Sequence, residues 1–235
     1  MENSPSIAQN LTQIQKKAEI IGVASQRAKH AVQLIAVSKT KPNEAIEEAL
    51  AAGQTHFGEN RMQELQEKMN AIDSNDIIWH MIGTLQSNKI KHIAARVNWI
   101  HSAYKESHLI EIDKRAAQHN RVIEVLLQVN ISEEEQKSGC EPSEVEHLIN
   151  ISKQLGNIRL RGFMGIAKLV NDPEEIRHQF RFLKELLDAH SNIEAPNIKL
   201  DQLSMGMTND MEVAIQEGAT MIRVGRAIFG ERNYT

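Results

Sequence analysis

Hydrophobic positions along this chain follow two alternating periods from about residue 31 onward. Short apolar runs rich in β-branched residues, typical of buried strands, alternate with longer stretches in which apolar residues recur every three or four positions, as in amphipathic helices. The first pair consists of QLIAVS at 33–38 and, after Pro42, the helical NEAIEEALAA, which stops at Gly53. The pattern therefore predicts a strand followed by a helix.

The same pair repeats along the chain and predicts about eight strands. These strands are 33–38, 55–58, 77–83, 98–102, 122–129, 159–166, 199–204 and 220–224. The helices are 43–53, 61–69, 88–96, 106–119, 142–155, 173–189 and 209–217, with a short one after Gly225. Such alternation implies parallel pairing, and eight units close a (β/α)8 TIM barrel of ~200 to 250 residues. An open doubly wound sheet is the alternative, but its glycine-rich turn is missing, because Lys39-Thr40-Lys41-Pro42 follows the first strand.

We expect one domain over residues 1–235, because no glycine- or serine-rich linker divides the chain. Residues 1–30 would hold an extra N-terminal helix, with apolar residues at helical spacing over 6–30, which we interpret as a cap or lid. Residues 31–230 would form the barrel, and 231–235 a tail.

Composition narrows the function classes. The 235 residues include 27 Lys and Arg against 31 Asp and Glu, a formal net charge of −4, and only 4% are aromatic. This chain therefore lacks the basic surface and the stacking side chains of a nucleic-acid binder. No apolar run approaches the ~18 residues of a membrane helix, and no targeting signal is visible. The single cysteine, Cys140, fits a reducing compartment, so we expect a cytoplasmic protein with no membrane partner.

Lys39 is the first candidate for chemistry. It shares a face with Ile35 and Val37, so its amine is expected to point into the barrel mouth, where the active sites of such barrels lie. Desolvation there disfavours the charged ammonium, and the neutral amine is the form that condenses with an aldehyde or ketone. The position alone also fits a lysine at a strand end whose head lies in water.

Small residues follow the last two strands. Ser204 and Gly206 come at the end of the seventh strand, and Gly225 follows the eighth, directly before a short helix that begins at Arg226. Barrels commonly bind phosphate between these two loops and the amino end of a short helix, through backbone N–H groups. Either loop alone is also typical of a simple turn, so the pair at this location is what predicts a phosphate site.

Arg223 shares the inward face of the last strand with Met221 and Gly225, and barrel closure makes that strand a neighbour of the first. We therefore expect Arg223 beside Lys39. A buried guanidinium needs an acceptor such as a carboxylate, a phosphate or an aromatic nitrogen. An amine, a phosphate site and an arginine around one mouth indicate a site for pyridoxal 5′-phosphate (PLP), with Lys39 as its Schiff-base lysine.

Seven motifs in fixed order closely resemble the pyridoxal phosphate homeostasis protein family, known as YggS in bacteria and PROSC in animals. They cover the chain from about Leu34 to Gly230. The motifs are AVSKTKP (36–42), FGENRMQE (57–64), WHMIGTLQSNK (79–89), QVNISEEEQKSG (128–139), LRGFMGI (160–166), LSMGMTNDME (203–212) and IRVGRAIFG (222–230).

This resemblance implies a single type III PLP-binding barrel, related to the N-terminal half of bacterial alanine racemase. It implies that the cofactor is held on Lys39 and that Arg223 faces the pyridine nitrogen. The other implied contacts are Ser204, Gly225 and Arg226 to the phosphate, and Asn60 in the pocket. Many members have threonine where this chain has Arg226. If residue 226 contacts the phosphate through its backbone N–H, this difference in side chain has no effect on the contact. The implied role is PLP homeostasis, with apo PLP-dependent enzymes as possible recipients.

The residues also favour a carrier over a catalyst. An arginine opposite the ring nitrogen favours an unprotonated pyridine, which stabilises a carbanion poorly. Racemases with such an arginine use a second acid/base, typically a tyrosine from another domain. Here the tyrosines are Tyr104, which we interpret as a packing or surface residue, and Tyr234 in the tail. We expect a monomeric binding protein without efficient turnover; the alternative is a PLP-dependent racemase or related enzyme of low activity.

Two further classes stay open. A lysine-dependent aldolase would share the lysine and the phosphate site, but it needs a second acid/base at an adjacent strand end. A metal hydrolase would use His56, His80 and His101, although isolated strand histidines are usually packing residues. Lys137, in the EEEQKSG loop, is a candidate for regulating access to the pocket, and Cys140 is expected to be a structural thiol.

Overall fold

The structure, a computed structural model, describes residues 5–132, 134, 138–170 and 172–231. Within these ranges, eight parallel strands pair in chain order and close into a barrel. The strands are β1 (Gln33–Val37), β2 (His56–Glu59), β3 (Ile78–Met81), β4 (Trp99–Ala103), β5 (Ile123–Gln128), β6 (Ile158–Met164), β7 (Ile198–Ser204) and β8 (Met221–Val224). The (β/α)8 barrel that the alternation predicts is therefore confirmed.

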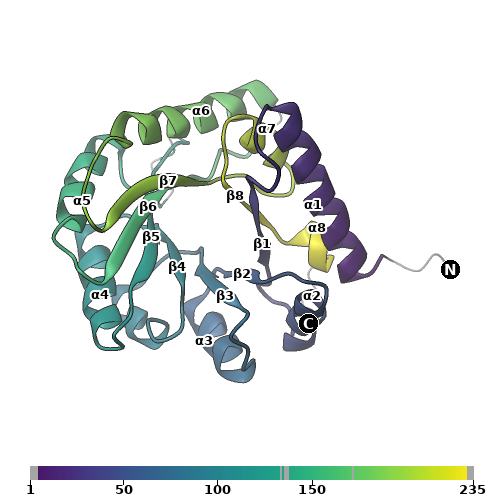
Figure 1. The fold of residues 1–235 in the computed structure, drawn as a ribbon, viewed down its shortest axis with the longest axis horizontal. Helices are drawn as coiled ribbons and strands as arrows, with labels where there is room; N and C mark the ends of the chain where they lie inside the picture. Colours follow the sequence, from purple (N-terminus) through teal and green to yellow (C-terminus); the bar gives the residue numbers. More distant parts are fainter. Residues whose placement is uncertain (1–4, 133, 135–137, 171, 232–235) are drawn as a thin grey trace.

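Helices connect the strands and lie around the outside of the barrel (Figure 1). They are α2 (Asn43–Ala51), α3 (Met62–Ala71), η1 (Ser87–His92), α4 (Glu106–Ala117), η2 (Pro142–Glu144), α5 (Val145–Ser152), α6 (Pro173–His190), α7 (Met211–Gln216) and α8 (Arg226–Phe229). The helical stretch expected over 88–96 is present as η1, a 3-10 helix that ends at His92. Ile93 and Ala94, just beyond its end, are fully buried, and the chain continues there as a turn.

The extra N-terminal helix, α1 (Ile7–Ala24), is present but shorter than predicted. Ser6 and Gln9 form a reciprocal capping box at its start. Its end comes before residue 30 because the chain turns at Gln26, which has a φ of +59°, and the Arg27 N–H donates to the Gly22 carbonyl.

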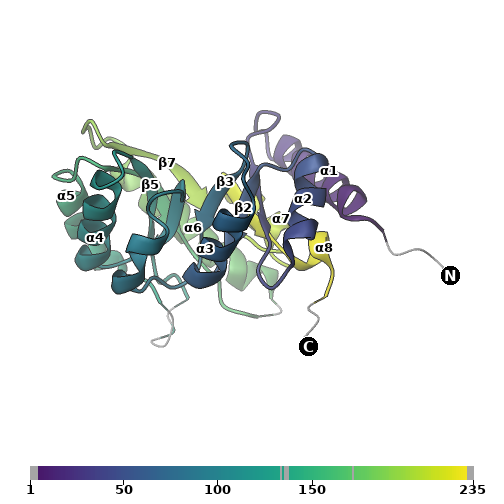
Figure 2. The ribbon, with the colours of Figure 1, turned by 90° about the horizontal axis from the view of Figure 1, so that it is seen from below.

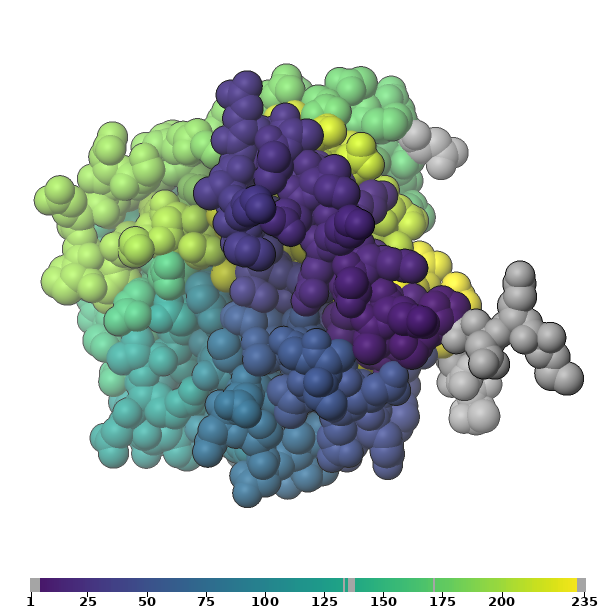
Figure 3. Space-filling view, turned by 45° about the vertical axis from the view of Figure 1, so that its right-hand side comes forward, coloured from purple at the N-terminus to yellow at the C-terminus, as the bar shows by residue number. Residues whose placement is uncertain are grey.

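The interpretation of α1 as a lid is wrong. It packs against α7, α8 and α2 on the outer surface, as Figure 3 shows for the purple helix. Because α8 has only four residues, α1 takes the outer position that a full eighth barrel helix would fill. In both ribbon views α1, α2 and α8 lie at one end of the molecule and α4 and α5 at the other (Figures 1 and 2).

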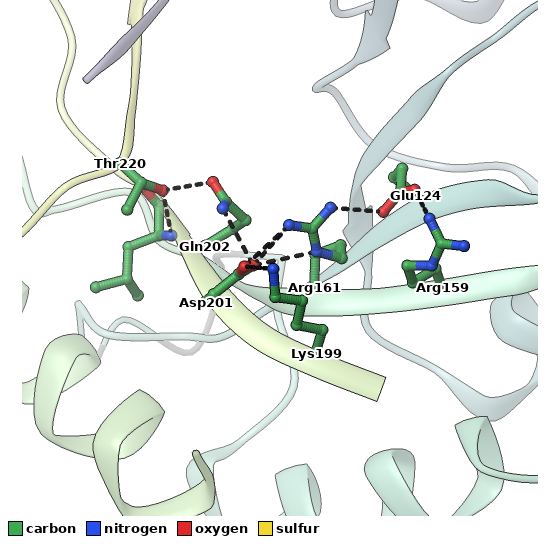
Figure 4. A network of polar contacts seen from close by, with 8 residues as sticks. Glu124, Arg159, Arg161, Lys199, Asp201, Gln202 and Thr220 are labelled. Carbon is green, nitrogen blue, oxygen red and sulfur yellow. Dashed lines mark hydrogen bonds and ion pairs between the residues drawn. The ribbon is translucent and has the colours of Figure 1, made fainter. Parts of the chain in front are cut away.

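The amino-terminal half of β5, β6 and β7 carries a charged network (Figure 4). Arg161 donates to both oxygens of Asp201, at 2.8 and 3.0 Å, and to Glu124 at 3.0 Å. Its guanidinium also lies 5.5 Å from the centre of the Trp99 ring. An apolar cluster of Ile35, Leu126, Met164 and Met221 fills part of the interior and packs against Trp99. The predicted site residues lie at the other end of the barrel, where the strands end.

Candidate functional site

Lys39 lies two residues after β1, partly buried in a turn at the carboxyl end of the strand, where the sequence places it. The next residue, Thr40, has a φ of +62°. This left-handed conformation costs a β-branched residue on the order of 1 to 2 kcal/mol, so the surrounding structure must hold it. The turn that presents the lysine is thus a strained segment of backbone.

A buried ion network, here called the lysine clamp, holds both neighbours of Lys39. It consists of Glu59 on β2 and Glu64 and Lys68 on α3. The Lys68 ammonium donates to the Ser38 carbonyl, to Glu59 Oε1 and to Glu64 Oε1, each at 2.7 Å. Glu59 Oε1 also accepts from the Ser38 hydroxyl at 2.6 Å, and Glu64 Oε1 accepts from the backbone N–H of residue 40 at 2.5 Å.

Glu59 is the most deeply buried carboxylate of the lysine clamp. Its side chain is fully buried, and its Oε2 makes no hydrogen bond within the part of the chain that the structure describes. Burial raises the pKa of Glu59, while the Lys68 charge and the hydrogen bonds from Lys68 and Ser38 oppose that rise. Lys68 is thus the group that offsets the cost of this buried carboxylate.

Arg223, Ser204 and Gly206 are brought together by β7 and β8. The Arg223 side chain donates from Nη1 to Ser204 Oγ at 2.7 Å and from Nη2 to the Gly165 carbonyl at 3.0 Å, and its backbone N–H donates to the Gly206 carbonyl at 2.9 Å. Arg223 is only 5% exposed, and burial lowers its pKa to about 10, against an opposing effect of the Asp210 charge. It is therefore ionised at neutral pH, yet none of the described ion pairs includes it.

The pairing of β1 with β8 sets the depth of Arg223. Arg223 lies opposite Ile35, two residues before β1 ends, which is about 7 Å along the strand at ~3.3 Å per residue, and Lys39 follows in the turn beyond that end. The strands are neighbours, as predicted, and the backbone of Arg223 lies deeper in the barrel than that of Lys39. Gly225 is the nearer residue, since a Cβ there would come within 3.1 Å of the Val37 carbonyl.

The remaining predicted residues also lie at carboxyl ends of strands. Asn60 follows β2 and is partly exposed, and a Cβ on Gly83 would collide with its backbone. Gly206 has a φ of +92°, and a Cβ there would lie 2.5 Å from the Ala214 Cβ. Arg226 begins α8 with an exposed side chain.

Three histidines form a continuous chain of hydrogen bonds across the barrel interior, here called the histidine chain. His56 Nδ1 lies 2.9 Å from His80 Nε2, His80 Nδ1 lies 2.9 Å from His101 Nε2, and His101 Nδ1 lies 2.8 Å from Ser204 Oγ. The expectation that these histidines are packing residues fits their burial and their satisfied hydrogen bonds, but they are linked to one another rather than isolated. The missed signal is their recurrence once per strand-helix unit, which places them at neighbouring strands of one closed barrel.

Burial keeps the histidine chain neutral. It lowers the pKa of His56, and it lowers the pKa values of His80 and His101 well below the usual range, with further lowering by His101 and His56 at His80 and by the Arg223 charge at His101. Because these ring nitrogens bond to one another and to Ser204, they do not converge on a metal. No group of three His, Cys, Asp or Glu among the described residues is arranged to hold one.

Other residues singled out in the sequence have packing roles or lie outside the described ranges. Tyr104 packs edge to face on His108, with ring centres 4.9 Å apart. Cys140 is buried, and burial, together with the charges of nearby glutamates, raises its pKa to about 12, which fits a structural thiol. Lys137 and Tyr234 lie outside the residues that the structure describes.

Comparisons with known proteins agree with this fold. The family model described as alanine racemase, N-terminal domain, matches residues 6–233. The pyridoxal phosphate homeostasis protein of Aquifex aeolicus is 42% identical over 224 residues, which cover 95% of this chain and 96% of that protein. The protein of the same name from Escherichia coli K12 is 37% identical and covers 97% of this chain and 98% of its own.

Solved structures give the same result. PipY of Synechococcus elongatus PCC7942, solved with PLP bound, is 36% identical with a TM-score of 0.81, and the match covers 96% of this chain and 100% of that one. Its structure without PLP has a TM-score of 0.86 at the same coverage. No helix that the structure describes is long and apolar enough to span a membrane. The chain belongs to the pyridoxal phosphate homeostasis protein family, within the wider group that shares the alanine racemase N-terminal domain.

Proposed function

We propose that this protein binds PLP at the carboxyl end of its barrel, with Lys39 as the covalent attachment, and stores or delivers the cofactor without efficient turnover. The observation that carries the proposal is Arg223, a buried and ionised guanidinium that the described ion pairs leave without a carboxylate. Its described acceptors, Ser204 Oγ and the Gly165 carbonyl, are neutral, and an aromatic nitrogen would give this buried cation a further acceptor. The names of the relatives and the PLP-bound PipY structure support the same ligand.

The chemistry of the remaining donors fits the parts of PLP. When bound, the cofactor supplies an aldehyde that joins covalently to a lysine amine, and Lys39 is the lysine at the end of β1. The Ser204 hydroxyl and the backbone at Gly206 and Gly225 would hold the phosphate. Packing also requires glycine at both positions, since a Cβ would crowd Ala214 at Gly206 and Val37 at Gly225. Arg226 would contribute its backbone N–H, since its side chain is exposed.

Arg223 also shapes what the bound cofactor can do. A guanidinium donates hydrogen bonds and cannot accept them, so it would hold the pyridine nitrogen in its unprotonated form and weaken its electron-withdrawing character. Asn60, at the end of β2, would complete the pocket wall. These roles favour secure binding over stabilisation of a carbanion.

The barrel mouth supports a carrier in another way. A cavity of about 220 Å³ opens at the carboxyl ends of β3, β5 and β6. Its walls are uncharged, and they include Ile82, Thr84, Gln128, Asn130, Ser138 and Ile166. A racemase needs a second acid/base that faces the reacting carbon; Tyr104, the described tyrosine near the mouth, packs on His108 instead. We propose a monomeric cytoplasmic carrier that hands PLP to apo PLP-dependent enzymes.

Absorbance of the purified protein with PLP tests the attachment. We expect a near-ultraviolet or visible band that borohydride removes, and Lys39→Ala should abolish this response while weaker, noncovalent binding remains. Lys41→Ala is the matched control, because Lys41 lies in the same turn and its ammonium binds the Glu231 carbonyl at 2.7 Å. A borohydride response that survives Lys39→Ala would contradict the proposal. Efficient racemisation, decarboxylation or transamination in an amino-acid screen would contradict the carrier role.

A further inference from the structure

The histidine chain ends at the Ser204 hydroxyl, and the hydrogen bond from Arg223 limits how this hydroxyl can bond. Arg223 has donors and no acceptor, so Ser204 Oγ must accept the hydrogen bond from Nη1 at 2.7 Å. The hydroxyl proton must then go to another group. His101 Nδ1, at 2.8 Å, is the acceptor that the described contacts offer.

This constraint fixes the proton positions along the whole chain. If Ser204 donates to His101 Nδ1, then His101 carries its proton on Nε2 and donates to His80 Nδ1. His80 in turn carries its proton on Nε2 and donates to His56 Nδ1. Without a bound anion, all three neutral rings are therefore Nε2–H tautomers, and every nitrogen inside the chain has a partner.

A second arrangement satisfies the same atoms. When the Ser204 hydroxyl donates its hydrogen bond to an anion, its oxygen accepts from both Arg223 and His101, which requires a proton on His101 Nδ1. His80 and His56 must then also carry their protons on Nδ1, so that each hydrogen bond in the chain runs in the opposite direction.

We propose that the histidine chain is a tautomeric relay that positions the Ser204 hydroxyl, switching from Nε2–H to Nδ1–H when a phosphate group accepts a hydrogen bond from that hydroxyl. This inference rests on the proposed binding of the PLP phosphate at Ser204. It makes His56, His80 and His101 positioning residues of the phosphate site, although His56 lies on the opposite side of the barrel interior from Ser204.

The protons balance without any change in charge. In the switch, the Ser204 proton passes to His101 Nδ1, the Nε2 proton of His101 passes to His80 Nδ1, and that of His80 passes to His56 Nδ1. His56, the partly exposed end, releases its Nε2 proton to water. The Ser204 oxygen regains a proton from water, so that the proton released by His56 is replaced, and each histidine carries one proton before and after.

The relay gives the phosphate site a donor at little electrostatic cost. Ser204 turns its hydroxyl toward the anion while it keeps the bond from Arg223, and no second positive charge enters the buried interior. The lowered pKa values of the three histidines are consistent with this, because burial and the Arg223 charge oppose an imidazolium in the chain. Anion binding is thereby linked to the proton position on His56, two strands beyond His101.

Nitrogen-15 NMR of histidine-labelled full-length protein tests the relay, because it shows which ring nitrogen carries the proton. Spectra are compared without ligand, with inorganic phosphate, with PLP, and with pyridoxal, which has the same ring and aldehyde but no phosphate. We expect Nε2–H as the main tautomer of all three residues without ligand and with pyridoxal, and a shift of all three to Nδ1–H with PLP or phosphate. The exposed His147 is the internal control and should not change.

Ser204→Ala separates the relay from the proposed function. This variant should still bind PLP, more weakly, and its histidines should no longer respond. Wild-type protein that binds PLP, by absorbance, while its histidine tautomers stay unchanged would overturn the relay and leave the proposed function standing. If PLP fails to bind, the proposed function fails, and the ligand-free spectrum still decides the relay: mixed or Nδ1–H tautomers there would overturn it.

Discussion

Lys68→Met removes the ammonium at the centre of the lysine clamp while it keeps most of the apolar side chain. Three hydrogen bonds of 2.7 Å are lost, to Ser38, Glu59 and Glu64. Removing one partner of a buried ion pair leaves the other charge uncompensated and costs about 3 to 5 kcal/mol. Glu64 is one-fifth exposed and is screened by water, so the cost comes mainly from Glu59. We expect a loss of about 3 kcal/mol at neutral pH.

The pH dependence of this loss identifies Glu59 as its source. Burial already raises the pKa of Glu59, and without Lys68 its folded-state pKa rises further. A carboxyl group whose pKa is raised on folding contributes stability below its unfolded-state pKa and loses that contribution as pH rises through the folded-state pKa. The deficit of Lys68→Met relative to the wild type should therefore be largest at neutral pH and shrink as the pH falls.

Guanidinium unfolding at neutral and at mildly acidic pH measures both effects. Lys184→Met is the matched control: Lys184 pairs with Asp188 on the exposed face of α6, and its loss should cost only about 0.5 kcal/mol. Adding Glu59→Gln to Lys68→Met should recover a large part of the stability, because the uncompensated charge is gone. A Lys68→Met deficit below about 1 kcal/mol, or one that is equal at both pH values, would refute the reasoning.

Three further substitutions and one thiol-labelling reaction test other parts of the structure. Gly206→Ala should destabilise the protein by about 2 kcal/mol or more, because Gly206 has a positive φ and the new methyl group would lie 2.5 Å from Ala214. Gly22→Ala, with no atom within 4 Å of the new methyl group, should stabilise α1 by about 0.5 to 1 kcal/mol. Thermal unfolding should therefore show changes in stability of opposite sign for the two variants, and changes of the same sign would contradict this. Arg223→Met should alter the absorbance band of bound PLP and loosen its retention, and the assignment to the ring nitrogen is wrong if neither changes. Cys140, whose pKa is raised to about 12, should react with a thiol reagent far more slowly in the folded than in the unfolded protein, and equal rates would argue against its burial.

The barrel could be predicted from the sequence because its strands are buried in a regular way. Ile35 and Val37 point inward and Leu34 and Ala36 outward against helices, so β1 reads as one short apolar run. β5 follows the same rule over most of its length, whereas β6 and β7 carry charged residues between their apolar positions. The end of α1 could not be predicted in this way, since apolar spacing continues past Ala24 and the turn depends on the backbone conformation at Gln26.

The site was predictable only where a residue lies at a strand end. Lys39, Ser204 and Gly225 are recognisable from position and motif, but the depth of Arg223 depends on the register between β1 and β8, which composition does not reveal. Lys68 follows Glu64 by four residues, a spacing that is common on solvated helix faces.

The histidine chain and the lysine clamp share one reason for being missed. Glu59 lies on a different element from Glu64 and Lys68, and His56, His80 and His101 each lie on a different strand. The pairing of neighbouring strands and the packing of α3 near β2 bring these residues within hydrogen-bond distance, and the bond from His101 to Ser204 crosses from β4 to β7. Because these are tertiary contacts, neither the hydrophobic period nor the spacing of residues along the chain predicts them.

The most direct test of the account is the location of the covalent bond to PLP. Wild-type protein is incubated with PLP, reduced with borohydride, digested, and analysed by mass spectrometry of its lysine-containing peptides. We predict that the added mass of the reduced cofactor lies on Lys39 and that Lys41 and Lys68 are unmodified. Modification of another lysine in place of Lys39, or its even distribution over exposed lysines, would contradict the central claim.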